Sequence, residues 1–283
     1  MATLIDGKAI AQAIRRDLSH KVADLQKGQR PVPGLAVIIV GNDAASRIYV
    51  NMKEKACAEA GFLSREYALP EETDENAVLR IVDELNADRA IHGILVQLPL
   101  PGRISADRVI DAIDPVKDVD GFHPYNVGRL FSGNPFHRSC TPAGIIELLD
   151  RSGISIEGKK AVIVGRSSIV GKPLAMMLLN RHATITVCHT RTRNLADETR
   201  QADILVAAAG RAEVIRGDMV KEGAVVIDVG VNRLENGKIV GDVNFDEAAA
   251  RAGFITPVPG GVGPMTIAML LSNTYNGAVR TIG

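Results

Sequence analysis

The sequence predicts an α/β protein of two domains, each built around a parallel β-sheet. A chain of 283 residues is long for a single hydrophobic core, so two domains are expected. In both halves, short apolar runs alternate with segments of helical periodicity, which is typical of βα units. Between the halves, this periodicity disappears over residues 115–142, where Gly, Pro, Asn and Ser are frequent. Because ligands of such folds bind outside the carboxyl ends of the strands, we expect the active site in the cleft between the domains.

The N-terminal half carries three strand-like runs. The run over residues 35–40 is continuously apolar and ends at Gly41, as a buried parallel strand does. Asp43 is suited to cap the helix that follows, and Gly61 is suited to end it. The elements expected in this half are a helix over residues 8–25, strands over 35–40, 65–69 and 93–96, and helices between Asp43 and Gly61, over 75–86 and over 106–113.

The C-terminal half shows the same alternation after the irregular segment. Its expected elements are helices over residues 143–151, 170–181 and 266–279 and strands over 161–164, 184–187, 204–207 and 224–229. We therefore assign residues 1–140 plus 265–283 to the first domain and residues 141–264 to the second.

The composition is that of an ordinary soluble globular protein. Lys plus Arg equal Asp plus Glu at 33 each, so no overall field attracts nucleic acid or an anionic membrane. No run approaches the roughly 18 apolar residues of a membrane span, and the N-terminus lacks a basic segment followed by an apolar core. The three cysteines are far apart, and no Cys pair has metal-ligand spacing. We expect a cytoplasmic protein with free thiols, no metal site, and no nucleic acid or membrane partner.

A strand, a glycine turn and a helix follow one another over residues 160–179. Gly165 lets the chain turn sharply, and Gly171 lets the helix approach the strand or a ligand closely. With Arg166 and Ser167, this turn is a candidate phosphate cradle, because a helix N-terminus presents N–H groups and a positive dipole. The spacing is Gly-x-Ser-x-x-x-Gly, so an ordinary turn between strand and helix is the alternative. On the first interpretation, the second domain is Rossmann-like and binds a dinucleotide.

The stretch His-Thr-Arg-Thr-Arg at residues 189–193 follows the second strand of this half. In a dinucleotide fold, an acidic residue here holds the ribose 2′-hydroxyl of NAD, whereas Arg accommodates the 2′-phosphate of NADP. The stretch contains no acidic residue, so Thr190 and Arg191 favour NADP, and a basic surface loop is the alternative. Gly210 and Val231 lie among small residues that end the next two strands, where a cofactor or merely a tight turn requires them.

Polar side chains also follow the strands of the first half. Ser46, Tyr49 and Lys53 are spaced to share one helix face, which lines a polar pocket or is simply solvated. Gln97 follows a very apolar strand and precedes a Pro-x-Pro turn, so its amide points into the crevice or satisfies loop backbone groups. Asp120 begins an Asp-Gly pair, which is also a frequent turn former.

The segment over residues 256–266 has three Gly and three Pro in eleven residues. Pro264 suits the first turn of the last helix. A loop so rigid and so sharply bent is either a ligand wall, formed by Pro259, Gly260, Gly261 and Pro264, or a crossing back to the first domain. We favour the ligand wall, because binding residues concentrate on loops.

Taken together, five motifs resemble those of the bifunctional methylenetetrahydrofolate dehydrogenase/methenyltetrahydrofolate cyclohydrolase family. They occur in the family's order and, with the start of the chain, cover nearly its whole length. The motifs are Ser46 with Tyr-Val-Asn-Met-Lys at 49–53, Val-Gln-Leu-Pro-Leu-Pro at 96–101, Asp-Val-Asp-Gly at 118–121, Gly-Arg-Ser with Val-Gly-Lys-Pro at 165–173, and Pro-Val-Pro-Gly-Gly-Val-Gly-Pro-Met-Thr at 257–266.

The resemblance implies two reactions on tetrahydrofolate derivatives. 5,10-Methylenetetrahydrofolate is oxidised to 5,10-methenyltetrahydrofolate with NADP, and water then opens the ring to 10-formyltetrahydrofolate. By the family match, Lys53 is the central catalytic residue, Tyr49 orients the substrate, Gln97 partners Lys53, and Asp120 grips the pterin. A Lys in a closed cleft beside a cationic substrate loses affinity for its proton, so its amine can act as a general base.

The family match also implies the binding residues and, by analogy, a homodimer. Folate would be bound by the first-domain residues Ser46, Tyr49 and Asp120 and walled by the loop residues Pro259, Gly260, Gly261 and Pro264, and the second domain would bind NADP through Gly165, Arg166, Ser167, Thr190, Arg191, Gly210 and Val231. Departures from the family pattern at Thr190 and Ala212 touch only the cofactor side. The alternatives are a related two-domain NAD(P)-dependent dehydrogenase acting on another small substrate, and a non-catalytic folate or NADP sensor.

Overall fold

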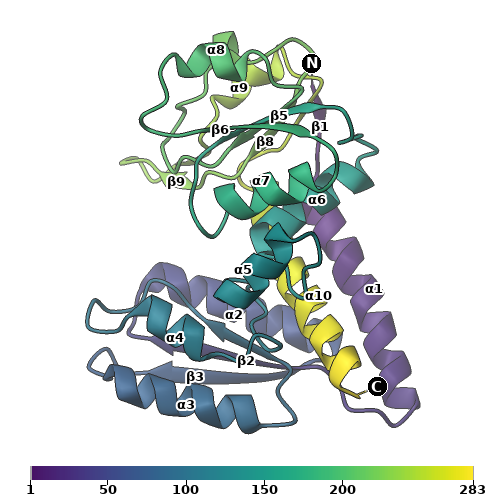
Figure 1. Cartoon of the computed structure of the whole chain (residues 1–283), viewed down its shortest axis with the longest axis vertical. Coiled ribbons are helices and arrows are strands. Elements are labelled where there is room, and N and C mark those ends of the chain that lie inside the picture. The colour runs from purple at the N-terminus through teal and green to yellow at the C-terminus, as the bar shows by residue number, and fades with distance from the viewer. Residues whose placement is uncertain (1, 283) are drawn as a thin grey trace. The chain divides into compact units, whose positions relative to one another are not determined.

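The computed structural model describes residues 2–282, which divide into two compact units (Figure 1). One unit contains residues 2–11 and 141–266, and the other contains residues 12–140 and 267–282. The helices α1 (Gly7–Lys27) and α10 (Val262–Ile282) contribute residues to both units. No helix within residues 2–282 is long and apolar enough to cross a membrane.

The unit of residues 12–140 and 267–282 is built on a three-stranded parallel sheet. The strands are β2 (Gly34–Val40), β3 (Leu63–Leu69) and β4 (Gly93–Val96), and their order is β3-β2-β4. All seven residues of the central strand β2 are buried, because helices cover both faces of the sheet. The helices that begin and end within this unit are α2 (Ala44–Ala60), α3 (Glu75–Ala87), α4 (Ala106–Ala112) and α5 (Pro124–Phe131).

Local capping fixes the helix α2, which carries three of the candidate site residues. The Asp43 side chain accepts a hydrogen bond from the Ser46 N–H at 2.7 Å, and Gly61 ends the helix with φ of 75°. A left-handed residue at this position costs glycine nothing, because it has no Cβ. The caps that we expect from the sequence are therefore present, and they set where α2 begins after β2.

The other unit is built on a six-stranded sheet in which every neighbouring pair is parallel. The strands, in the order β1-β11-β8-β7-β5-β6, are Thr3–Leu4, Phe254–Ile255, Val225–Asp228, Ile204–Ala207, Lys160–Val164 and Thr184–Cys188. Helices α6 (Cys140–Arg151) and α7 (Gly171–Leu179) lie on one face, and α8 (Leu195–Thr199) and α9 (Phe245–Ala249) lie on the other (Figure 1). A 3-10 turn, η1 (Gly217–Met219), and a small hairpin, β9 (Asn232–Arg233) with β10 (Ile239–Val240), complete the unit.

The α/β class with parallel sheets is confirmed. Every strand expected from the sequence is present, with ends shifted by two residues at most. The structure corrects the sequence interpretation at α5, which lies inside the segment expected to be irregular. Tyr125, Val127 and Phe131 of this helix are exposed and Leu130 is buried, so its apolar residues do not form one continuous buried face. The last helix also begins earlier than expected, at Val262, because Pro264 is tolerated in a first turn.

Candidate functional site

The helix α2 places Ser46 and Lys53 inside the protein and Tyr49 at its surface. Ser46 is 6% exposed, Lys53 is 8% exposed and Tyr49 is 43% exposed. Long amines are almost never buried to this extent without a partner. The interpretation as a purely solvated face is therefore wrong for Ser46 and Lys53.

Lys53 finds its partner in Gln97, directly after β4. The Nζ atom of Lys53 donates a hydrogen bond to Oε1 of Gln97 at 2.9 Å. Gln97 is itself held, because its backbone N–H donates to the Ile38 carbonyl oxygen and its Nε2 donates to the Leu98 carbonyl oxygen. The Gln97 side chain therefore fills both roles considered from the sequence. Its Nε2 satisfies a backbone carbonyl of the loop, and its Oε1 orients the Lys53 amine without adding a charge.

Asp120 lies in a turn whose shape is set by Asp118. The buried Asp118 carboxylate accepts hydrogen bonds from the backbone N–H groups of Phe122 and His123, at 3.2 and 2.8 Å. Gly121 has φ of 70°, and a Cβ atom there would come within 2.7 Å of the Arg138 backbone. Asp120 is thus a turn residue, as its sequence suggests, and it is also half-buried.

The charges of Lys53 and Asp120 act on each other in this buried setting. Burial lowers the pKa of the Lys53 amine, and the nearby Asp120 opposes that shift. Burial also raises the pKa of Asp120 to about 6, against the influence of Lys53 and with that of Asp118. A lysine whose pKa is lowered and whose amine is fixed by an amide is suited to take a proton from water.

The thiols of Cys57 and Cys140 lie near Lys53 and Asp120, and the sequence did not predict that they would. The Cys140 thiol donates to the Val119 carbonyl oxygen at 3.2 Å, and it lies close enough to Asp120 for each group to influence the pKa of the other. Burial holds the pKa of Cys140 well above its ordinary value and raises that of Cys57 to about 12. Both therefore remain neutral thiols, not nucleophiles. The only signal in the sequence was that Cys57 follows Lys53 by one helical turn.

The glycine turn in the other unit is packed backbone against backbone. Gly165 has φ of 133°, and a Cβ atom there would overlap the Ala208 carbonyl oxygen. A Cβ atom at Gly171 would overlap the Gly165 carbonyl oxygen. Ser167 shapes the turn before α7, since its Oγ accepts from the N–H groups of Val170 and Gly171 at 3.1 and 3.3 Å. Arg166 and Ser167 remain exposed on the turn, within reach of a ligand.

The remaining cofactor candidates are exposed at turns that follow strands of the same sheet. The turn after β6 is shaped by His189, whose Nδ1 accepts from the Arg191 N–H at 3.1 Å. Thr190 and Arg191 are exposed on it. Gly210, with φ of 64°, follows β7, and Val231, 59% exposed, follows β8. Carboxyl ends of parallel strands meet at one edge of a sheet, so these turns lie along the same edge as the glycine turn.

The Pro/Gly loop belongs to this unit and is tied to its neighbours by backbone. The Lys8 N–H donates to the Gly260 carbonyl oxygen at 2.9 Å, and a Cβ atom at Gly261 would come within 2.6 Å of the Pro257 carbonyl oxygen. Pro259 is exposed and Pro264 is half-buried. The Thr266 hydroxyl is hydrogen-bonded with that of Thr141 at 2.9 Å. The loop is therefore held in one shape with part of its surface open.

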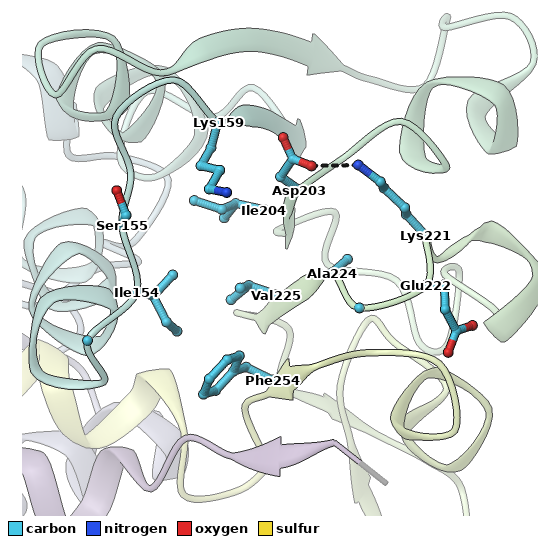
Figure 2. A pocket seen from close by; sticks show the side chains of 12 residues that line it. Ile154, Ser155, Lys159, Asp203, Ile204, Lys221, Glu222, Ala224, Val225 and Phe254 are labelled. Atoms are coloured by element: carbon cyan, nitrogen blue, oxygen red, sulfur yellow. Dashed lines mark hydrogen bonds and ion pairs between the residues drawn. The ribbon is translucent and has the colours of Figure 1, made fainter.

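A hollow of about 330 Å³ lies elsewhere in the same unit (Figure 2). Its lining includes Ile204, Val225 and Phe254, which are the first residues of β7, β8 and β11. An ion pair between Lys221 and Asp203, at 2.6 Å, crosses its rim. The hollow thus opens at the amino ends of the strands and includes none of the candidate residues, which follow the carboxyl ends.

Comparison with known proteins identifies related chains over the full length. Residues 5–120 match the catalytic domain of tetrahydrofolate dehydrogenase/cyclohydrolase, and residues 139–282 match its NAD(P)-binding domain. The bifunctional protein FolD of Pelobacter propionicus is 59% identical over 280 residues, which cover 99% of each chain.

Solved structures give the same result. The bifunctional FolD methylenetetrahydrofolate dehydrogenase/cyclohydrolase of Campylobacter jejuni superposes with a TM-score of 0.97 at 51% identity, over 99% of this chain and 100% of that one. The Trypanosoma brucei enzyme, solved with NADP and an inhibitor, has a TM-score of 0.96 at 43% identity, over 99% and 98% of the two chains.

We predict that Gly171→Ala destabilises the protein by about 1–3 kcal/mol, because the new methyl group must displace the Gly165 backbone. Urea unfolding followed by circular dichroism measures this. Gly263→Ala is the matched control, since Gly263 also lies in a first helical turn and a Cβ atom there meets nothing within 4 Å. Equal unfolding midpoints for the two variants would contradict the packing argument.

Proposed function

The chain belongs to the tetrahydrofolate dehydrogenase/cyclohydrolase family, and we propose that it oxidises 5,10-methylenetetrahydrofolate with NADP and hydrolyses the product to 10-formyltetrahydrofolate. The observation that carries this proposal is the buried Lys53, with its lowered pKa, hydrogen-bonded to Gln97 beside Asp120. Lys53 supplies a base, Gln97 supplies a neutral group that positions it, and Asp120 supplies a carboxylate that can accept hydrogen bonds from a flat heterocycle.

Hydride transfer requires the substrate and the nicotinamide to be aligned, and it requires no proton from the protein. When bound, NADP accepts the hydride at C4 of its nicotinamide. The chain contributes a site for the dinucleotide, for which we propose Gly165, Arg166, Ser167, Thr190, Arg191, Gly210 and Val231. This donor set fits NADP, because residues 189–193 offer two Arg side chains and no carboxylate to the 2′-phosphate. The two glycines at 165 and 171 keep side chains out of the turn.

Ring opening requires a base that takes a proton from the attacking water. Water adds to the methenyl carbon, and Lys53 takes the proton that this water releases, while Gln97 holds the amine. The bond from that carbon to N5 then breaks, the new hydroxyl loses its proton, and N5 gains one. The net reaction consumes one water and releases one proton. Because the methenyl group is already cationic, a neutral amine next to it is favoured over an ammonium.

Asp120 is proposed to bind the pterin. With a pKa of about 6, its carboxylate is largely ionised at pH 7 and can accept two hydrogen bonds from an aminopyrimidine edge. Tyr49, exposed on the same helix as Lys53, is proposed to orient the substrate. Ser46 and the loop residues Pro259, Gly260, Gly261 and Pro264 complete the proposed folate contacts.

We also propose, by analogy with the family, that the protein is a homodimer, and, because isolated thiols suit a reducing compartment, that it is cytoplasmic. We further propose residues 1–140 plus 265–283 as the folate domain and residues 141–264 as the NADP domain. Sedimentation equilibrium of the purified chain tests the dimer. The KM values for NADP and for 5,10-methylenetetrahydrofolate, measured in variants of each domain, test the division of labour.

The direct test of the function is an absorbance assay of the purified protein with 5,10-methylenetetrahydrofolate and NADP. We expect NADPH and the methenyl compound to form first and 10-formyltetrahydrofolate to follow. A parallel reaction that starts from 5,10-methenyltetrahydrofolate, without NADP, isolates the hydrolysis. Absence of both reactions would refute the proposal.

We predict that Lys53→Met lowers the cyclohydrolase rate by about 10²–10⁴-fold and spares more of the hydride step, because only ring opening needs the base. In the unsubstituted protein, the hydrolysis rate should rise with pH up to the lowered pKa of Lys53, and this rise should be absent from the variant. Lys55→Met, at an exposed position of the same helix, is the control and should match the unsubstituted protein. Equal losses of both activities in Lys53→Met would argue against this role.

We predict that Arg166→Ala and Arg191→Ala each raise the KM for NADP about tenfold, since a charged hydrogen bond to phosphate is lost. The KM for NAD, which has no 2′-phosphate, should change less than twofold. Steady-state kinetics with both cofactors measures this, and Arg30→Ala, at an exposed position in the other unit, is the control. Similar changes for NAD and NADP would show that neither Arg reads the 2′-phosphate.

A further inference from the structure

Two buried carboxylates lie next to the proposed cofactor turns and have no part in the chemistry above. Asp228 ends the strand β8, and Asp242 follows the strand β10. Their exposed fractions are 4% and 0%. Carboxylates this deeply buried need several hydrogen bonds to remain stable, so what they bind shows what they do.

Asp242 accepts four hydrogen bonds, two on each oxygen. Its Oδ2 accepts from the N–H groups of Ala209 and Gly210 at 2.6 and 2.8 Å. Its Oδ1 accepts from the N–H of Arg211 and from Nδ2 of Asn232, both at 2.9 Å. Three consecutive peptide groups of the turn after β7 thus point at one carboxylate.

Asp228 holds Asp242 in place. Its Oδ1 accepts from the Gly230 and Asp242 N–H groups at 2.9 Å each, and its Oδ2 accepts from the Val243 N–H at 3.0 Å. The Asp228 N–H in turn donates to the Thr256 hydroxyl at 2.8 Å. The backbone at Asp242 and Val243 is therefore fixed by hydrogen bonds to Asp228.

Two glycines make this arrangement possible. A Cβ atom at Gly230 would overlap the Asp242 carboxylate, and a Cβ atom at Gly241 would overlap the Asp228 carboxylate. Each acid therefore packs against a glycine beside the other acid, and neither side chain can move without displacing its neighbour. We call Asp228, Asp242, Gly230 and Gly241 the carboxylate clasp.

The direction of the carbonyl groups follows from the direction of the N–H groups. In a trans peptide the C=O and N–H bonds point in opposite directions. Because the N–H groups of Ala209, Gly210 and Arg211 point at Asp242, the carbonyl groups of residues 208, 209 and 210 point away from it. The Ala208 oxygen accordingly faces the Gly165 turn. Residues 209 and 210 are exposed, and a Cβ atom at Gly210 would meet nothing within 4 Å.

We propose that Asp242 is a positioning residue for the cofactor: it turns the carbonyl oxygens of residues 209 and 210 outward, so that this turn accepts hydrogen bonds from a hydroxyl or amide group of the dinucleotide and does not bind its phosphates. The inference rests on the proposed function in taking the ligand to be NADP. It places phosphate recognition on the turns after β5 and β6, where Arg166 and Arg191 are exposed.

The test is Asp242→Asn, which keeps the size of the side chain but puts an amide N–H where N–H donors converge. The N–H groups of Ala209, Gly210 and Arg211 then lose part of the carboxylate that accepts their hydrogen bonds, and the peptide groups of the turn can rotate. We expect the KM for NADP to rise at least tenfold, while kcat at saturating NADP stays within about threefold. The KM for 5,10-methylenetetrahydrofolate and the NADP-independent hydrolysis of the methenyl compound should change less than twofold. A purely structural defect would lower kcat and hydrolysis as well.

Two further variants make the result decisive. Asp246→Asn, the same substitution at an exposed position of α9, should leave all four quantities unchanged. Asn232→Ala removes one donor of Asp242 and leaves the three backbone donors, so it should raise the KM for NADP about two- to fourfold. It decides the matter if Asp242→Asn does not fold.

The proposal is overturned if the KM for NADP is unchanged in Asp242→Asn, or if the KM values for both substrates rise together. Failure of the proposed function gives a different result, because the unsubstituted protein would then show no NADP-dependent oxidation at all. In that case, calorimetric titration of the same variants with NADP still tests whether Asp242 shapes a dinucleotide site.

Discussion

Buried backbone N–H groups in turns need acceptors, and buried carboxylates supply them in both units of this chain. Asp118 accepts from two backbone N–H groups, and Asp228 and Asp242 accept from three each. A buried carboxylate loses several kcal/mol of hydration, and converging N–H dipoles replace what water provided. The turns held in this way carry Asp120, Gly210 and Val231, so the same hydrogen bonds that permit the fold also shape the proposed site.

The opposite problem arises at Lys53, where a cation is buried beside one acid and one amide. Its hydrogen bond goes to the amide oxygen of Gln97, which adds no negative charge, and burial lowers the pKa of the amine. Asp120 compensates in part, because its charge favours the ammonium, but burial weakens its own ionisation. The two groups thus have pKa values that are drawn toward each other, which suits a base and a binding carboxylate that must both operate near neutral pH.

Sequence periodicity predicted the strands of four or more residues, most of which are short apolar runs that end at a turn residue, as at Gly41 after β2. It did not predict the two-residue strands β1, β9, β10 and β11. It also did not predict the short helices α8 and α9, nor α5, most of whose apolar residues are exposed, and it placed the start of α10 four residues late, at Thr266. Most candidate residues could be identified because they follow strands and carry polar side chains or lie in glycine-rich turns. The carboxylate clasp could not, because Asp228 and Asp242 are 14 residues apart and meet only through tertiary packing. Spacing likewise leaves open whether Asp120 is merely a turn former, whereas the structure places it in a turn, half-buried, where its charge influences Lys53.

The buried thiols bear on how the protein meets oxidants. Peroxides and alkylating reagents attack the thiolate, and they reach it only where solvent does. Cys57, Cys140 and Cys188 are all buried, and burial raises the pKa of each. A site that places Cys140 beside Asp120 therefore carries sulfur without redox sensitivity. The enzyme should therefore remain active under oxidative conditions that inactivate enzymes with exposed cysteines of low pKa.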